Sequence, residues 1–273
     1  MMYATLCMRR GAAHCQLGGF DTALGEYEGA LTLLTAITTF LSTLSTPSDA
    51  ERVMQQQAAG TLEEARGDVG RIRLLRDTDT LKKEGDGVFA KGDVAAAVSK
   101  YTQALALVPV HVGCLSNHSA CKIAKGDFQG CVEDCTTALA LLELDTSSNT
   151  SSSSSTTSSS STTSLSTPGV GSVGGWSSQR GVNMLVSILP PAGSDKRKSW
   201  VLKTVSRRGA ALARLGRLDE AVADFSLACS MDPKNEALKV DLNRLVNFRE
   251  GKRSSGGIAS LMGNKDGIQP TEQ

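Results

Sequence analysis

A spacing of 34 residues recurs along this sequence, and it limits the possible folds more than any other feature. The dipeptide Gly92-Asp93 returns 34 residues later as Gly126-Asp127, and Gly18 and Gly216 mark two further copies. Small and aromatic residues follow each glycine at matching offsets: Ala23, Tyr27 and Ala30; Ala97, Tyr101, Ala104 and Pro109; Cys131, Cys135 and Ala138; Ala221, Phe225, Ala228 and Pro233. A fixed period of this length indicates a protein built from stacked copies of one small unit.

Each copy has the pattern of two helices joined by a tight turn. After Gly92, the apolar residues between Val94 and Leu105 are spaced by threes and fours, as on one face of an α-helix. The preceding helix carries a similar apolar stripe at Leu81, Val88 and Phe89. One such hairpin cannot bury both of its faces, so the copies are expected to stack into an all-α solenoid.

This hairpin pattern resembles the tetratricopeptide-repeat (TPR) family, which has the same period. The resemblance implies a TPR helical-hairpin solenoid, with units at about 4–37, 78–111, 112–145 and 202–235. It divides the chain into a lone unit (1–37), a loop and connecting helix (38–77), two units of a triple (78–145), an insertion (146–198), the third unit with a capping helix (199–250) and a tail (251–273). The lone unit aligns with the last one through RRGAAHCQLGG and RRGAALARLGR, so it is interpreted as the end of a preceding module, and the chain as either a fragment or an incomplete gene model.

Two helices are expected outside the hairpins. The stretch from Asp49 to Leu75 should form a helix with Ser48 as its N-cap, although its three glycines weaken it by roughly 1 kcal/mol each. After the last unit, a helix with Leu238, Leu242 and Leu245 on one face should cap the open end of the stack.

The insertion and the tail are predicted to be disordered. Positions 146–166 are almost entirely Ser and Thr, and such a composition buries too little apolar surface to fold. Because the cost of closing a loop grows only logarithmically with its length, the stack can tolerate the insertion. Within it, Met184 to Leu189 is a short apolar patch, interpreted either as a weakly packed segment or as a docking peptide.

Polar side chains recur on the first helices of the triple, and they form the candidate binding site. Lys82 and Asp86 are four residues apart in the first unit, and so are Lys203 and Arg207 in the third. Asn117 falls on the corresponding face in the second unit. Because residues i and i+4 lie on the same face of a helix, we expect these five side chains to line one peptide-binding site.

The set resembles the dicarboxylate clamp of TPR co-chaperones, which hold the C-terminal EEVD of Hsp90 and Hsp70. Lys82, Asn117, Lys203 and Arg207 match the family pattern, whereas Asp86 stands where the family has Asn. The resemblance implies that cations and an amide hold an α-carboxylate and an Asp side chain by charge-assisted hydrogen bonds. An ionised Asp86 only accepts hydrogen bonds, and at about 5 Å it would repel a bound carboxylate by roughly 3 kcal/mol before screening.

Segments such as RRGAAHCQL and LKKEGDGVFAKGD are also similar to the dynein axonemal assembly factor 4 and sperm-associated antigen 1 families. That similarity implies a cytoplasmic role in dynein arm assembly for cilia, with Hsp90, Hsp70 and other dynein assembly factors as partners. A second interpretation, favoured by Asp86, is a scaffold that binds other peptides independently of chaperones.

Charge and hydropathy argue against other classes of partner. A net charge of +1 gives no electrostatic basis for binding nucleic acid or an anionic membrane. No apolar run is long enough to span a bilayer, and the N-terminus lacks the order of a signal peptide. The seven cysteines are therefore interpreted as reduced thiols of a cytoplasmic protein, with Cys131 and Cys135 at core positions of the repeat.

Catalytic and metal chemistry is not expected. Cys114, His118 and Cys121 have helical spacing, but a zinc site needs a fourth ligand and only His111 is near. No phosphate-binding loop or nucleophile motif occurs. We therefore expect neither a cofactor nor an enzymatic activity.

Overall fold

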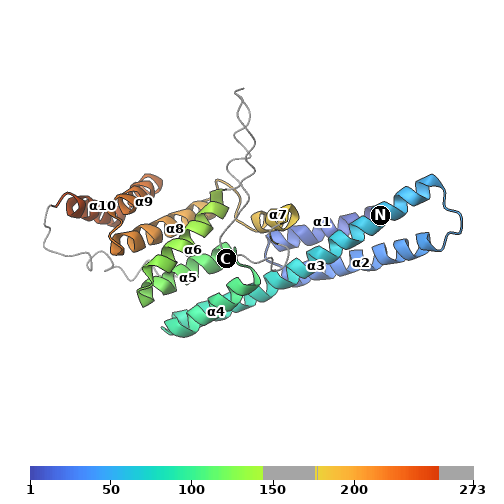
Figure 1. Cartoon of the computed structure of the whole chain (residues 1–273), viewed down its shortest axis with the longest axis horizontal. Helices are drawn as coiled ribbons and strands as arrows, with labels where there is room; N and C mark the ends of the chain where they lie inside the picture. The colour runs from blue at the N-terminus through green and yellow to red at the C-terminus, as the bar shows by residue number, and fades with distance from the viewer. Residues whose placement is uncertain (144–175, 177, 252–273) are drawn as a thin grey trace, which may run out of the picture. The chain divides into compact units, whose positions relative to one another are not determined.

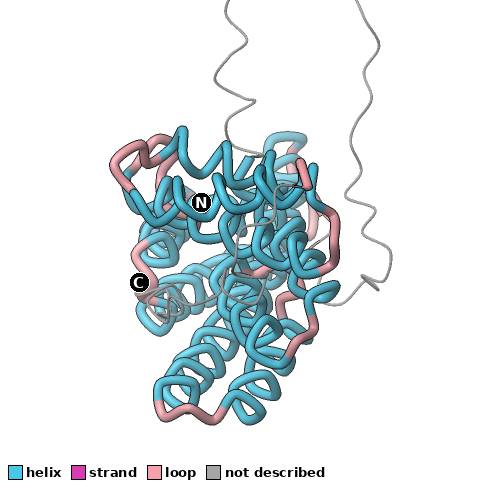
Figure 2. The backbone as a smooth tube through the Cα atoms, turned by 90° about the vertical axis from the view of Figure 1, so that its left-hand side faces the viewer, coloured by secondary structure: helices cyan, strands magenta, loops and turns pink. Residues whose placement is uncertain are grey.

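The computed structural model describes residues 1–143, 176 and 178–251, and every regular element in that part of the chain is an α-helix (Figure 2). The all-α prediction is therefore confirmed for these residues. The chain divides into two compact units: unit 1 comprises Met1–Asp79 and Leu165–Ile188, and unit 2 comprises Thr80–Ser164 and Leu189–Gln273. The predictions of disorder at 146–175 and 252–273 lie outside the described residues.

Unit 1 is built on a hairpin of α1 (Met2–Gln16) and α2 (Phe20–Ser42), which pack along each other (Figure 1). The small and aromatic residues of the repeat are buried in it: Ala23, Tyr27 and Ala30. Helix α3 (Asp49–Ala90) begins at the predicted N-cap, where Ser48 and Glu51 each bond the other's backbone N–H in a capping box. Helix α7 (Gln179–Ser187) also belongs to this unit.

Helix α3 is longer than the sequence pattern predicts. The connecting helix expected to end near Leu75 continues without a break to Ala90, so that the whole helix has 42 residues. No Gly or Pro occurs between Leu75 and Leu81, and nothing there would end a helix. The connecting helix and the first helix of the next hairpin are therefore one element, and the boundary between the units falls inside it.

Unit 2 contains the end of α3 and six further helices: α4 (Val94–Leu107), α5 (Val112–Lys125), α6 (Phe128–Glu143), α8 (Asp195–Arg214), α9 (Leu218–Met231) and α10 (Glu236–Arg249). From α4 onward each packs on the next one in this order (Figure 1). Helix α8 thus takes its place beside α6 although the insertion separates them in sequence. The predicted capping helix is present as α10, whose Leu245 is fully buried while Leu238 and Leu242 pack against the same core cluster.

The turn glycines explain why the hairpins recur. Gly18, Gly92, Gly126 and Gly216 all adopt left-handed backbone conformations, with φ from 76° to 85°. A side chain is strained in that region, whereas glycine adopts it freely and commonly ends a helix. Each glycine therefore stops the first helix of a hairpin and lets the chain reverse.

In each hairpin, a small residue of the first helix lies close to a larger side chain of the second helix. A Cβ atom added to the glycine would lie 2.5 to 3.1 Å from ring carbons in three hairpins: Gly11 with Tyr27, Gly85 with Tyr101, and Gly209 with Phe225. In the α5–α6 hairpin the corresponding pair is Ser119 and Cys135, both fully buried. The aromatic ring thus requires glycine, and the smaller Cys135 leaves room for a serine.

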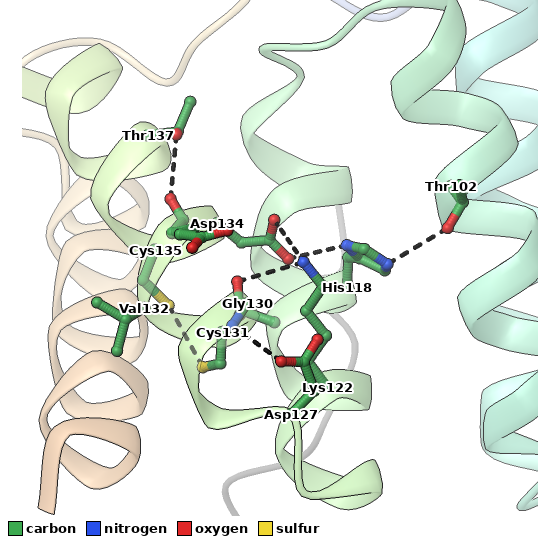
Figure 3. A network of polar contacts seen from close by, with 12 residues as sticks. Thr102, His118, Lys122, Asp127, Gly130, Cys131, Val132, Asp134, Cys135 and Thr137 are labelled. Atoms are coloured by element: carbon green, nitrogen blue, oxygen red, sulfur yellow. Dashed lines mark hydrogen bonds and ion pairs between the residues drawn. The ribbon is translucent and has the colours of Figure 1, made fainter. Parts of the chain in front are cut away.

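A polar pair next to this contact also joins the two helices of each hairpin. Its members are 16 residues apart: Arg10 and Glu26, Glu84 and Lys100, His118 and Asp134, Arg208 and Asp224. The match of Arg10 with Arg208 agrees with the alignment of the first and last copies. In the α5–α6 hairpin, His118 Nδ1 lies 2.8 Å from Asp134 Oδ2, though not aligned as a hydrogen bond, and Lys122 Nζ lies 3.2 Å from Asp134 Oδ1 (Figure 3).

The prediction that residues 146–198 are disordered is wrong at the C-terminal end of that range. Residues 179–187 form α7, and α8 begins at Asp195. Ser178 Oγ accepts a hydrogen bond from Gly181 N, and Ser194 Oγ accepts one from Arg197 N. Serine-rich composition indicates disorder on average, but a single serine just before a helix-forming run is an N-cap, and both helices start in this way.

The buried cysteines give a direct test of this core. All seven cysteines are free, and six of them are buried, whereas Cys229 is half-buried. Burial raises the pKa of the Cys121 thiol to about 11 and is the main cause of the same rise at Cys15. Burial also raises the pKa of Cys229, but its half-buried thiol is the one that a reagent can reach. We therefore expect an aromatic disulfide reagent at pH 8 to modify only Cys229 rapidly in the native protein and all seven thiols in urea. Rapid native modification of several thiols would contradict the buried core.

Candidate peptide-binding site

Asp86 lies at the centre of the predicted site in unit 2. Its Oδ2 accepts a hydrogen bond from Lys82 Nζ at 2.8 Å, one turn earlier on α3. Its Oδ1 accepts from Tyr101 Oη on α4 at 2.5 Å and from Asn117 Nδ2 on α5 at 2.8 Å. Lys82 and Asn117, from two helices, thus both donate to Asp86, and the Tyr101 hydroxyl donates to it from a third helix.

Arg207 extends this set from α8. Its Nη1 donates to the backbone oxygen of Ser116 at 2.6 Å and to Ser116 Oγ at 2.7 Å. Ser116 immediately precedes Asn117 on α5, so the fourth predicted residue lies beside the Asp86 cluster. Lys203 is half-buried and lies one turn before Arg207 on the same face of α8.

The cations of the site are deeply placed. Lys82 is only 3% exposed, and Arg207 is buried, which lowers the pKa of its guanidinium without removing its charge. A buried charge is costly unless it is paired and hydrogen-bonded, and Asp86 provides that partner for Lys82. An incoming carboxylate must therefore compete with Asp86 for both Lys82 and Asn117.

Tyr101 and Ser116 belong to the site although the polar pattern of the first helices does not include them. In the sequence, Tyr101 stands out only as the recurring aromatic residue of the repeat. Burial, followed by the hydrogen bond to Asp86, raises the pKa of its hydroxyl. The available signal was that Tyr stands where the last hairpin has Phe225, because a buried tyrosine hydroxyl needs a polar partner. Ser116 carries no such signal.

Arg207 is expected to stabilise the fold as well as the site. Arg207→Ala removes the donor for two oxygens of buried Ser116, and we expect it to lower the free energy of unfolding by about 1–3 kcal/mol. Lys203→Ala should change it by less than about 1 kcal/mol. Thermal unfolding followed by circular dichroism measures both, and equal midpoints for the two variants would contradict a structural role for Arg207.

The alternative zinc site is not formed. His118 directs its two ring nitrogens toward Thr102 and Asp134 (Figure 3). His111 Nδ1 accepts a hydrogen bond from Cys114 N as the N-cap of α5. Across the described part of the chain, no three His, Cys, Asp or Glu side chains are placed to hold a metal ion.

The described helices are all too short or too polar to cross a lipid bilayer.

Comparison with known proteins gives one local similarity. No family model matches the chain. A stretch of 64 residues is 41% identical to the FK506-binding protein-like protein of Mus musculus, 42% identical to that of Rattus norvegicus and 39% identical to that of Homo sapiens. The stretch covers 23% of this chain and only 18% of each relative. The similarity therefore concerns a small part of both proteins.

Proposed function

We propose that this chain is a TPR adaptor whose unit 2 binds the acidic C-terminal end of a partner protein. One observation carries the proposal: Lys82, Asn117 and Arg207 come from α3, α5 and α8 and meet around Asp86 and Ser116. The 34-residue hairpins, their left-handed glycines and the repeated glycine–aromatic contact support the TPR assignment. Stacked hairpins are also the kind of scaffold that presents an extended binding surface.

The charges of the site favour an anionic ligand. Lys82, Lys203 and Arg207 contribute three positive charges, and Asp86 contributes one negative charge. A chain end with an α-carboxylate and an acidic side chain complements the two remaining positive charges and the Asn117 amide. Because Asp86 already occupies Lys82 and Asn117, the affinity of the native site should be modest.

The finer proposal is that the ligand is the EEVD end of Hsp90 or Hsp70, bound in the cytoplasm during dynein arm assembly. It rests on the match of Lys82, Asn117, Lys203 and Arg207 to the clamp pattern. A second candidate is a scaffold that binds other peptides independently of chaperones. The hydrogen bonds that satisfy Asp86 favour this second candidate, because they leave the site complete without a carboxylate ligand.

Calorimetry separates these candidates. A free EEVD peptide is titrated into the wild-type protein, the Lys203→Ala variant and the Lys198→Ala variant. Lys203→Ala should weaken binding by about tenfold or more, the value expected for loss of one charge-assisted hydrogen bond. Lys198 is the matched control because it lies on the same helix and its side chain is 64% exposed.

The same peptide with an amidated C-terminus provides the decisive comparison. Amidation removes the α-carboxylate and should abolish binding if the site is a carboxylate clamp. Equal affinity of the free and amidated peptides would refute the clamp and favour the scaffold. Affinity purification with wild type and Lys203→Ala then tests whether the recovery of Hsp90, Hsp70 and dynein assembly factors depends on this lysine.

A further inference from the structure

Unit 1 holds a buried carboxylate that binds an arginine from outside the repeat. Asp68 on α3 is only 2% exposed. Arg180 on α7 donates to it from Nε, at 3.0 Å to Oδ1 and 3.1 Å to Oδ2, and from Nη2 to Oδ2 at 2.6 Å. Arg71 Nη2 donates to Oδ1 at 2.7 Å, and Arg180 Nη1 also donates to Glu64 Oε2 at 3.0 Å. A bidentate arginine–carboxylate pair of this kind is among the stronger polar contacts in proteins.

Asp68 belongs to the core of unit 1. Burial and then the charge of Asp68 raise the pKa of the Tyr27 hydroxyl, and the same two causes raise the pKa of Cys15 to about 11. Both residues lie in the α1–α2 hairpin, so the carboxylate faces that hairpin from α3. The side chain of Arg180 is 42% exposed, so its guanidinium reaches the buried carboxylate from the surface.

Helix α7 buries one side. Trp176, Gly181 and Leu185 are buried, and Val182, Met184, Val186 and Ile188 are half-buried, whereas Arg180 is exposed. The helix has nine residues and one serine N-cap. A helix of this length is not stable alone in water, so its contacts with unit 1 must hold it in helical form.

We propose that the Asp68 face of unit 1 is a second peptide-binding site, which takes a short helix bearing an arginine and apolar residues. The segment 176–188 of this chain is its tethered occupant. Two features support a reversible contact: α7 lies outside the 34-residue repeat, and a helix of nine residues is not stable without its contacts. The Met184–Leu189 patch is then part of a docking peptide, and this second site is independent of the one in unit 2.

Hydrogen exchange on the unmodified protein tests whether the occupant detaches. The backbone amides of α7 should exchange much faster than those of α2, because release of α7 requires no opening of the α1–α2 hairpin. Exchange of α7 only together with α2 would show that the segment is a permanent part of the core, and that result would overturn the proposal.

A peptide in trans tests the chemistry of the site. A labelled peptide of residues 176–188 is titrated into the full chain and into its Arg180→Ala variant, with fluorescence anisotropy as the readout. Because a tethered ligand acts at a high effective concentration, the peptide should bind Arg180→Ala at least about tenfold more tightly than wild type.

Two controls keep this second test decisive. A peptide in which the arginine is replaced by alanine leaves the protein unaltered and should lose its affinity for the Arg180→Ala chain. Gln179→Ala changes an exposed neighbour on α7 and should leave the chain as closed as wild type. Binding that does not depend on the arginine of the peptide, or that is equal in all three chains, would overturn the proposal.

Discussion

Replacing Asp86 with asparagine should tighten the binding of an acidic C-terminal peptide by about tenfold to a hundredfold. The native carboxylate neutralises Lys82 and accepts a hydrogen bond from the Asn117 amide. It therefore competes with the ligand for both side chains. Asparagine has nearly the same shape and can still accept from Tyr101, but it carries no charge that would neutralise Lys82. The repulsion that it removes amounts to roughly 3 kcal/mol at 5 Å before solvent screening.

Glu84→Gln is the matched control for this experiment. It raises the net charge by the same amount and lies on the same helix, where Glu84 pairs with Lys100 rather than with any residue of the site. Calorimetry with the free EEVD peptide should show a gain for Asp86→Asn and little change for Glu84→Gln. Equal affinities of the two variants would show that the carboxylate at position 86 does not control the site. The gain in affinity should also be smaller at high salt, because ions in the solvent screen the repulsion between Asp86 and the ligand.

Replacing Gly85 with alanine should destabilise unit 2 by about 1–3 kcal/mol, the range found for overpacked cores. The new Cβ would lie 2.8 Å from Tyr101 Cε1, and the hydrogen bond from that tyrosine to Asp86 limits how far the ring can move. Gly87 lies two residues further along α3, and a Cβ there meets nothing within 4 Å. Gly87→Ala should therefore stabilise the helix by about 0.5–1 kcal/mol.

Urea denaturation followed by circular dichroism measures the free energy of unfolding of both variants. The two substitutions lie on the same helix and should change it in opposite directions. Gly209→Ala provides a repeat of the test in the last hairpin, where the Cβ would lie 3.0 Å from Phe225 Cδ2. Equal stability of Gly85→Ala and Gly87→Ala would mean that the helices do not approach as closely as the structure has them.

The repeat could be predicted from the sequence because it is a local property. A left-handed glycine, a stripe of apolar residues and a small residue opposite a ring are each specified within one 34-residue copy. The hairpins, the turns at Gly92 and Gly126 and the capping role of α10 follow from such signals. The sequence also placed Lys82 with Asp86, and Lys203 with Arg207, four residues apart on one face of a helix.

Only the tertiary structure decided which polar groups are already paired. The Asp86–Asn117 bond joins residues 31 apart, the Arg207–Ser116 bond residues 91 apart, and the Arg180–Asp68 pair residues 112 apart. A sequence pattern shows that a side chain lies on a face, but its partner across the stack depends on how the helices pack. The continuity of α3 and the start of α7 do have local signals, namely the absence of Gly or Pro between Leu75 and Leu81 and the N-cap at Ser178. Composition does not decide, however, whether a helix of nine residues stays folded, because that depends on its burial against other helices.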